Sequence, residues 1–279
     1  MRPKFFVVFM SPNGSTRLVA DLFMQQLSRS DQQVASLNLA DHLLVPDFME
    51  EIADTENVCL LIGSPVYRDM AVPPVMDFIH KLPKMKNAWA IPFVTWGLAC
   101  SGIALWQMGK ALIEKGFRIV GAAKVASVHA MMRNLDHPIG EDHPDKDDQK
   151  QILQLTDLLV SRFETNEIKD LDLETLDYQS PEMSEECKGR MEKAWMIVPK
   201  KIDTNACSQC GLCEEECPVQ AIALDPYPKF TDSCFDCFNC IQFCPENAIQ
   251  PAKSLVEIQA NIVKRVNLIQ ERPLTQSFV

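Results

Sequence analysis

A chain of 279 residues is long enough to form two units, each with its own hydrophobic core. Its residues are 47% hydrophobic and 23% charged, as in an ordinary globular protein. The net charge of -11 excludes nucleic acid as an expected partner, because binding a phosphate backbone requires clustered Lys and Arg. It favours redox partner proteins that present a basic docking surface.

The N-terminal apolar run is too short for a secretory signal, and no small-residue cleavage site follows it. The stretch between Lys86 and Lys110 lacks charge and is long enough to span a bilayer, but Pro92, Gly97 and Gly102 interrupt it. A buried parallel strand followed by a buried helix explains this stretch better. We therefore expect no membrane span and a cytoplasmic location.

Residues 1–165 alternate apolar runs with amphipathic stretches, which is typical of a parallel sheet covered by helices. The strands are expected at about 4–10, 33–39, 58–63, 89–95 and 119–125. The helices are expected at about 15–27, 73–82, 101–115 and 147–163. Five such strands predict an α/β fold with a doubly wound parallel sheet in the flavodoxin-like order 2-1-3-4-5. Ligands of this fold bind beyond the C-terminal ends of the strands.

The loop after the first predicted strand leads directly into a helix. It reads Ser11-Pro12-Asn13-Gly14-Ser15-Thr16. Free backbone N–H groups, hydroxyls and the helix dipole would suit a phosphate there, and Asn13 and Gly14 can adopt the positive φ that such a loop requires. A simple strand-to-helix turn with a Ser/Thr cap would use the same residues, so this loop alone leaves both interpretations open.

Two further loops follow the third and fourth predicted strands. They read Gly63-Ser64-Pro65-Val66-Tyr67 and Thr95-Trp96-Gly97, and each carries an aromatic side chain that could lie against a flat ring. With the first loop they resemble the phosphate loop and the two isoalloxazine loops of flavodoxins and related FMN reductases.

The resemblance implies FMN as a cofactor. The residues that would bind it are Ser11, Asn13, Gly14, Ser15, Thr16, Ser64, Pro65, Val66, Tyr67, Thr95, Trp96 and Gly97. Flavodoxins usually carry Thr-Gly where this chain has Asn13-Gly14, and Pro12 lacks a backbone donor. The ring contacts of Trp96 and Tyr67 with the flavin each have an alternative. Trp96 could instead be buried under the following helix, and Tyr67 could contribute only its backbone.

Eight of the eleven cysteines lie between Cys207 and Cys244. They form the motif Cys-x2-Cys-x2-Cys-x3-Cys-Pro twice, the second copy 27 residues after the first. This is the bacterial two-cluster pattern, whereas structural zinc sites usually present two Cys-x2-Cys pairs separated by a longer loop. Over residues 201–252 the sequence resembles the two-cluster ferredoxins.

Three thiolates spaced by two residues can reach three corners of one metal cube, while the fourth cysteine, fixed by its proline, points toward the other cube. One [4Fe-4S] cluster is therefore assigned to Cys207, Cys210, Cys213 and Cys244, and the other to Cys234, Cys237, Cys240 and Cys217. Gly211 lets its loop approach the inorganic sulfurs closely.

These features predict four segments. Residues 1–165 form a flavodoxin-like FMN-binding domain, and 166–200 a linker with interdomain packing. Residues 201–252 form a small α+β domain with two [4Fe-4S] clusters, and 253–279 a C-terminal helical tail. The apolar spacing of the tail fits core packing or an oligomer contact, such as a homodimer.

This order of domains resembles flavodoxin–ferredoxin fusion proteins of anaerobic bacteria and archaea. The resemblance implies an electron-transfer iron–sulfur flavoprotein that relays low-potential electrons between two [4Fe-4S] clusters and FMN. The alternative is an oxidoreductase in which the clusters feed FMN to reduce a quinone, oxygen or a disulfide. The sequence has no G-x-G-x-x-G nicotinamide motif and no evident acid–base pair, so no catalytic residue is assigned. We favour the carrier and leave the enzyme question open.

Overall fold

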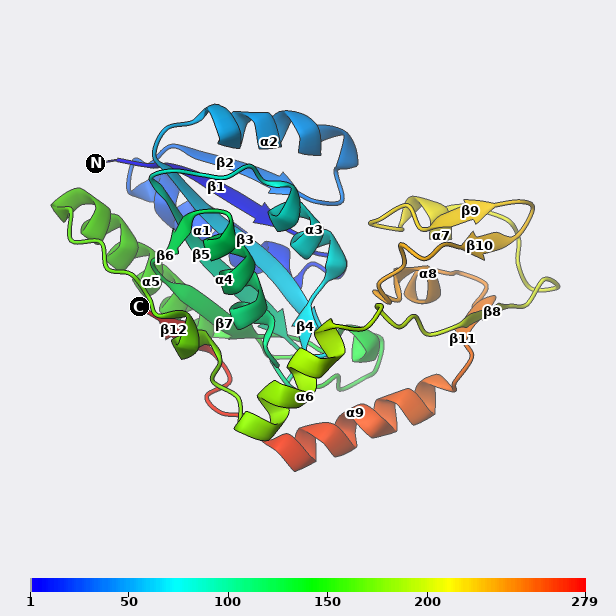
Figure 1. The fold of residues 1–279 in the computed structure, drawn as a ribbon. Helices are drawn as coiled ribbons and strands as arrows, with labels where there is room; N and C mark the ends of the chain where they lie inside the picture. Colours follow the sequence, from blue (N-terminus) through cyan, green and yellow to red (C-terminus); the bar gives the residue numbers. More distant parts are fainter. Residues whose placement is uncertain (1) are drawn as a thin grey trace.

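The computed structural model describes residues 2–279. Its main body is a sheet in which β2 (Val34–Asn38), β1 (Lys4–Phe9), β3 (Val58–Tyr67), β5 (Ala88–Trp96) and β7 (Ala122–Ala126) lie side by side in that order (Figure 1). Every neighbouring pair among them is parallel. This is the predicted 2-1-3-4-5 order.

The sheet has more strands than the five predicted. The last predicted strand, 119–125, is divided into β6 (Phe117–Ile119) and β7, both parallel to β5. Two short strands are added: β4 (Met70–Ala71) pairs with β3, and β12 (Gln276–Phe278) pairs antiparallel with β7.

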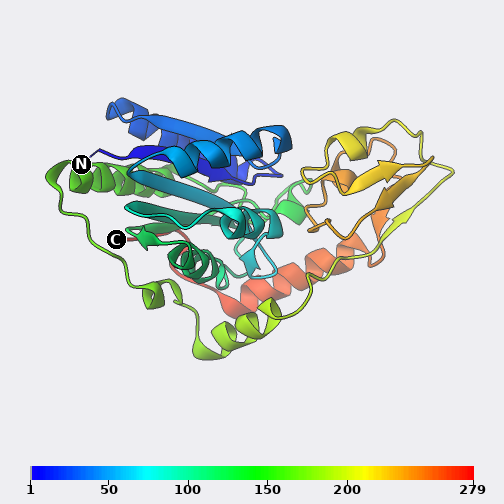
Figure 2. The same ribbon diagram turned by 45° about the horizontal axis from the view of Figure 1, so that its top comes forward.

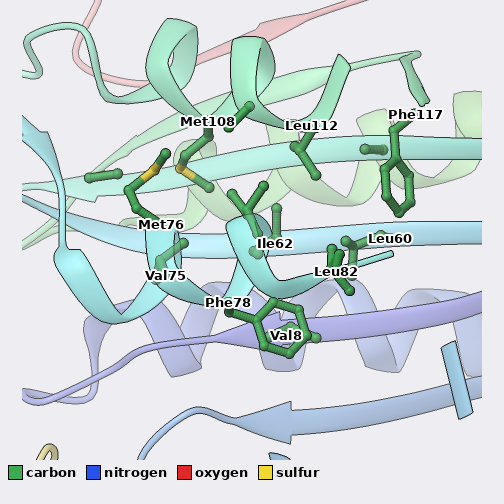
Figure 3. Packing of buried hydrophobic residues seen from close by; sticks show 14 of the residues in the cluster. Val8, Leu60, Ile62, Val75, Met76, Phe78, Leu82, Met108, Leu112 and Phe117 are labelled. Atoms are coloured by element: carbon green, nitrogen blue, oxygen red, sulfur yellow. The ribbon is translucent and has the colours of Figure 1, made fainter. Parts of the chain in front are cut away.

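Successive side chains of a strand point to opposite faces of the sheet, and on the central strands both sets are apolar. Helices therefore cover both faces. On β1, Phe5 and Val7 pack under α1 (Ser15–Arg29) and α5 (Lys146–Thr165). Phe6 and Val8 pack under α2 (Val45–Asp54), α3 (Pro73–Lys81) and α4 (Ala104–Glu114). Figure 3 shows this second cluster, with Leu60 and Ile62 of β3 facing α3 and α4.

The cysteine motifs form a smaller lobe (Figure 1). It contains two antiparallel ribbons, β8 (Lys200–Ile202) with β11 (Ile249–Pro251) and β9 (Ile222–Leu224) with β10 (Pro228–Phe230), and two short helices, α7 (Leu212–Glu215) and α8 (Asn239–Gln242). Its core includes Ile222, Phe238, Ile241 and Ile249.

The lobe is connected to the main body at both of its ends. The chain enters it through α6 (Pro181–Met191) and leaves through α9 (Leu255–Ile269), which lies beside α6 and runs back to the body (Figure 2). The tail is thus helical over much of its length, as its spacing predicts, but it ends in β12 at the edge of the sheet. The remaining elements are short 3-10 turns at His42–Leu44, Ala130–Met132 and Leu173–Leu176.

Within residues 2–279, no helix is both long enough and sufficiently apolar to traverse a lipid bilayer.

Candidate functional site

A cavity of about 910 Å³ lies at the C-terminal ends of β1, β3 and β5, between the main body, the lobe and helices α6 and α9. Nine of the twelve residues predicted to bind FMN line it. They are Ser11, Asn13, Ser15, Thr16, Pro65, Val66, Tyr67, Thr95 and Gly97. The opposite wall includes Phe235 of the lobe, Trp195 and Ile262. The three predicted loops therefore meet at one cavity.

The loop after β1 has the geometry of an anion site. Gly14 caps α1 with φ of 85°, so the first N–H groups of the helix point out of its N-terminus. The Thr16 hydroxyl is buried against the Thr95 hydroxyl at 2.8 Å, and Ser11 Oγ accepts from the Arg17 N–H. The Arg133 guanidinium donates to the Asn13 carbonyl, which places a cation beside the loop.

Sequence reasoning missed Arg133. It lies on the loop after β7, far from the phosphate loop along the chain, and it carries no motif of its own. Only the fold brings the two together.

Tyr67 joins the loop after β3 to the loop after β1. Its hydroxyl donates to Asn13 Oδ1 at 2.9 Å, and its ring lies nearly parallel to Phe235 with centroids 5.9 Å apart. Burial raises the pKa of Tyr67 well above its usual value, so its hydroxyl remains a donor. The side chain of Tyr67, and not only its backbone, thus forms part of the cavity wall.

Three of the predicted residues do not line the cavity: Gly14, Ser64 and Trp96. The Ser64 hydroxyl donates to the Pro65 carbonyl and accepts from the Val72 N–H, so it holds the loop in shape. Trp96 is 1% exposed, and its indole N–H donates to the Leu274 carbonyl at 2.8 Å. The C-terminal segment thus holds the indole N–H of Trp96, and the buried ring does not line the cavity, so the structure does not bear out a ring contact with a flavin.

The eight lobe cysteines are free thiols that fall into two sets. Cys207, Cys210 and Cys213 line one small hollow together with Cys244 from the second copy of the motif. Burial first, and then the charges of Cys240, Cys217 and Cys234, raise the pKa of Cys237. The fourth cysteine of the second copy thus lies with the first three of the first copy, as the spacing predicts. The reciprocal assignment of Cys217 to the other set stays a prediction.

The thiols of the described chain do not stand at the spacing of a zinc site. In residues 2–279, the ligand atoms of only one group of three lie within 4.8 Å of one another, and that group is His143, Asp145 and Asp148. Four sulfurs on one zinc would lie about 3.8 Å apart, given Zn–S bonds of about 2.3 Å. No three cysteine sulfurs of the described chain are this close, so the zinc alternative does not fit.

The His143 group has a structural explanation. Asp145 accepts from the N–H of Asp147 and of Asp148, and Asp148 accepts from the Asp145 N–H, which makes a capping box at the start of α5. The two carboxylates therefore satisfy the helix terminus, and His143 Nδ1 lies 2.5 Å from Asp148 Oδ2.

The two cysteine sets differ in their distance from the cavity. We name Cys217, Cys234, Cys237 and Cys240 the inner set, and Cys207, Cys210, Cys213 and Cys244 the outer set. Asn239, between two inner-set ligands, donates to the Pro12 carbonyl at 3.1 Å and accepts from the Asn13 amide at 3.2 Å. Phe235 and Asp236, also between inner-set ligands, line the cavity. The inner set therefore adjoins the predicted phosphate loop.

The comparisons with known proteins address the two units separately. Residues 200–223 match the 4Fe-4S binding domain family, which covers the first copy of the cysteine motif. A search of curated proteins returned no match.

Several solved structures resemble the main body. Rubredoxin oxygen:oxidoreductase from the anaerobe Desulfovibrio gigas is 19% identical with a TM-score of 0.46, over 59% of this chain and 37% of that one. This chain thus spans little more than a third of that protein. An archaeal flavodoxin is 17% identical with a TM-score of 0.44, over 58% of this chain and 99% of that one. Flavodoxin 2 from Bacillus cereus is 15% identical with a TM-score of 0.44, over 57% and 99%.

The order of the parallel sheet and the 4Fe-4S match carry the identification. The main body has the flavodoxin-like arrangement of strands, and the lobe carries an iron–sulfur binding motif. The chain is therefore a flavodoxin-like unit fused to a ferredoxin-like 4Fe-4S unit.

Proposed function

We propose that this protein relays low-potential electrons between two [4Fe-4S] clusters in the lobe and FMN in the cavity. The observation that carries the proposal is that Phe235 and Asp236, which lie between the inner-set ligands Cys234 and Cys237, line the same cavity as the three loops. Clusters exchange single electrons, and a flavin can hold one or two, so the pair can link one-electron to two-electron traffic.

The main body offers FMN its phosphate site at the N-terminus of α1. The helix dipole and the Arg133 guanidinium both favour a dianion there. Pro65, Val66 and Tyr67 line the cavity from the neighbouring strand end, where a flat ring would lie. We retain the nine predicted residues that line the cavity as the proposed FMN contacts, and Gly14 as the residue that shapes the phosphate loop. Ser64 and Trp96 are buried outside the cavity and are not retained as direct contacts.

Two clusters, rather than one, are supported by the two separate cysteine sets. Each set also receives one backbone N–H on sulfur, from Ala221 to Cys217 and from Ala248 to Cys244. Such bonds stabilise a thiolate ligand. Both sets thus contain four cysteines, and the fourth cysteine of each copy accepts a backbone N–H four residues later.

Covalent fusion makes the transfer between the cofactors intramolecular. The contact of Asn239 with Pro12 and Asn13, and that of Phe235 with Tyr67, hold the lobe against the loops without a docking step. We propose 1–165, 166–200, 201–252 and 253–279 as the functional segments, with the last also anchoring the lobe through β12.

One observation favours the oxidoreductase as a second candidate. The cavity extends past the three loops to α6 and α9, where Arg190 and Arg265 both pair with Asp69. At about 910 Å³ it lies near the upper end of typical ligand pockets, so it has room for FMN and a small acceptor. Rapid oxidation of the reduced protein by a quinone or a disulfide, saturating with acceptor, would favour this candidate over the carrier.

The proposed partners are redox proteins that dock on the exposed outer side of the lobe. Cys210, Glu214 and Glu215 are exposed there, and a basic partner would be attracted to this acidic surface. We also propose a cytoplasmic location and a homodimer.

The first test is the cofactor content of the anaerobically reconstituted protein. We expect about eight iron and eight sulfide per chain, from two four-iron cubes, and one FMN. Gly14→Val should lower FMN affinity at least tenfold, because Gly14 has φ of 85° and a branched side chain is strained there. The iron content should stay unchanged. Gly189→Val is the matched control, since a side chain at Gly189 meets nothing within 4 Å.

The second test is the rate of flavin reduction at several protein dilutions. In the intact chain this rate should not depend on protein concentration, whereas cutting the 166–200 segment and separating the two parts should make it fall on dilution. A wild type that takes up no FMN, or a flavin whose reduction slows on dilution of the intact chain, would refute the relay.

A further inference from the structure

A buried lysine touches the inner cysteine set. The side chain of Lys200, on β8, is 2% exposed. Its ammonium donates to the Val198 carbonyl at 3.2 Å, to Asp236 Oδ1 at 2.9 Å and to Cys234 Sγ at 3.4 Å. All three N–H donors of the ammonium are therefore used, and its position beside the ligand sulfur is fixed.

The surroundings leave a net positive charge at this place. Asp236 is 6% exposed and pairs with both Lys200 and Arg68, so one carboxylate faces two cations. The rings of Phe230 and Phe238 lie 5.4 and 5.5 Å from the ammonium. Because these rings exclude water, the charge of Lys200 is screened less than a surface charge would be.

The outer set has no equivalent cation. Lys200 pairs with Pro251 across β8 and β11, and the counterpart of Pro251 in the first copy, Leu224, pairs with Pro228. Pro228 of the first copy therefore occupies the position equivalent to Lys200. The nearest lysine of that strand, Lys229, is 65% exposed and pairs with Asp225.

We propose that Lys200 raises the reduction potential of the inner cluster above that of the outer cluster. A cluster becomes more negative when it gains an electron, so a fixed positive charge at its ligand sulfur stabilises the reduced form. In a protein that has received one electron, the electron passes from the outer cluster to the inner one. No bond is made or broken and no proton moves. The added electron then resides mainly beside the flavin cavity. This inference rests on the proposed function, which assigns two clusters to the lobe.

The experiment is a potentiometric titration of the anaerobic holoprotein, followed by electron paramagnetic resonance. The wild type should show two one-electron steps, and the step missing from the Cys217→Ala protein identifies the inner cluster. Lys200→Met should lower that step by about 59 mV or more, which is a tenfold change in the one-electron equilibrium between the clusters. The other step should not move.

Two matched variants separate charge from packing. Lys201→Met removes an exposed charge from the next position of β8 and should shift neither step. Lys200→Arg keeps the charge and should restore most of the inner-cluster potential. Asp236→Asn removes the opposing charge and should raise the inner-cluster potential, so its effect has the opposite sign.

Each outcome decides a separate point. Two unchanged steps in a Lys200→Met protein with full iron content would overturn the inference. If the Lys200→Met protein loses the inner cluster, the Asp236→Asn protein provides the test. A raised reduction potential of its inner cluster supports the inference, and an unchanged or lowered potential overturns it. A wild type with iron for a single cluster would instead contradict the proposed function.

Discussion

Between its ligands, the first copy of the cysteine motif carries Ser208, Gln209, Gly211 and Leu212. The second carries Phe235, Asp236, Phe238 and Asn239 at the positions 27 residues later. The backbone is nevertheless the same. Gln209 and Asp236 have φ of 58° and 63°, Gly211 and Phe238 have φ of 84° and 66°, and α7 and α8 begin at equivalent residues.

The two short helices differ in what they face. Glu214 and Glu215 of α7 are exposed. Their counterparts on α8 are Ile241, which is buried, and Gln242, which donates to the Ala130 carbonyl at 2.8 Å. The two copies thus share a backbone conformation, whereas the side chains between the cysteines face solvent in one copy and the main body in the other.

The largest effect is expected from the cysteines that the two copies exchange. Cys217→Ala should reduce the iron content from about eight to about four per chain, through loss of the inner cluster. Adding Cys237→Ala should remove no further iron, because both residues belong to the inner set. Adding Cys210→Ala should remove the rest. Iron and sulfide analysis checks this, and the reverse pattern of the two double variants would show that each copy binds its own cluster.

A smaller effect is expected where a phenylalanine holds a left-handed backbone. Phe238→Gly relieves strain of about 1–2 kcal/mol but empties a buried site worth about 3–5 kcal/mol, so we expect a net loss of about 1–4 kcal/mol. Denaturant unfolding of the holoprotein measures it. Gly211→Ala is the counterpart in the first copy, where a side chain has room but adds about 1–2 kcal/mol of strain. A stabilised Phe238→Gly protein would show that backbone strain outweighs packing.

The third prediction concerns the contact that makes one copy the inner one. Asn239→Leu introduces the residue found at the equivalent position of the first copy and leaves the Pro12 carbonyl and the Asn13 amide unpaired. We expect a loss of about 1–3 kcal/mol and slower flavin reduction by the clusters. Leu212→Asn makes the reverse change and should leave flavin reduction unaffected. Unchanged flavin reduction in Asn239→Leu would show that this contact does not support the transfer.

The sequence predicted the parallel sheet and the 4Fe-4S binding motif well, and for physical reasons. Parallel strands buried on both faces read as continuous apolar runs, and metal ligation fixes the spacing of cysteines within a few residues. The loops that line the cavity follow from the strand order, because this fold brings the C-terminal strand ends to one edge.

The contacts missed by the sequence analysis are between residues far apart in the chain. Leu274 covers Trp96 only because β12, a strand of three residues, reaches the sheet edge after the lobe is complete. Arg133 and Lys200 carry no motif, since a single cation has no spacing to recognise. The segment 45–54 forms α2 although no helix was predicted there.

The smallest expected effect concerns the solvent-facing copy. Replacing Glu214 and Glu215 by Gln should slow reduction by a basic protein donor severalfold at low salt, because exposed charges steer encounter more than they stabilise a complex. The difference should fade above about 0.15 M salt, where the Debye length is about 8 Å. The internal transfer to flavin should keep its rate at every salt concentration.

Asp54, the last residue of α2, and Glu56 provide the control for that experiment. They are also exposed acids, but they directly precede β3, so they lie at the edge of the sheet opposite the strand ends that face the lobe (Figure 1). Replacing them by Asn and Gln removes the same net charge, so it should reproduce only the part of the effect that depends on total charge. Stopped-flow reduction of the three proteins over a salt series measures the difference. Equal slowing by both pairs would mean that the donor does not distinguish the first copy from the rest of the surface, and electron entry would then have to be sought elsewhere on the molecule.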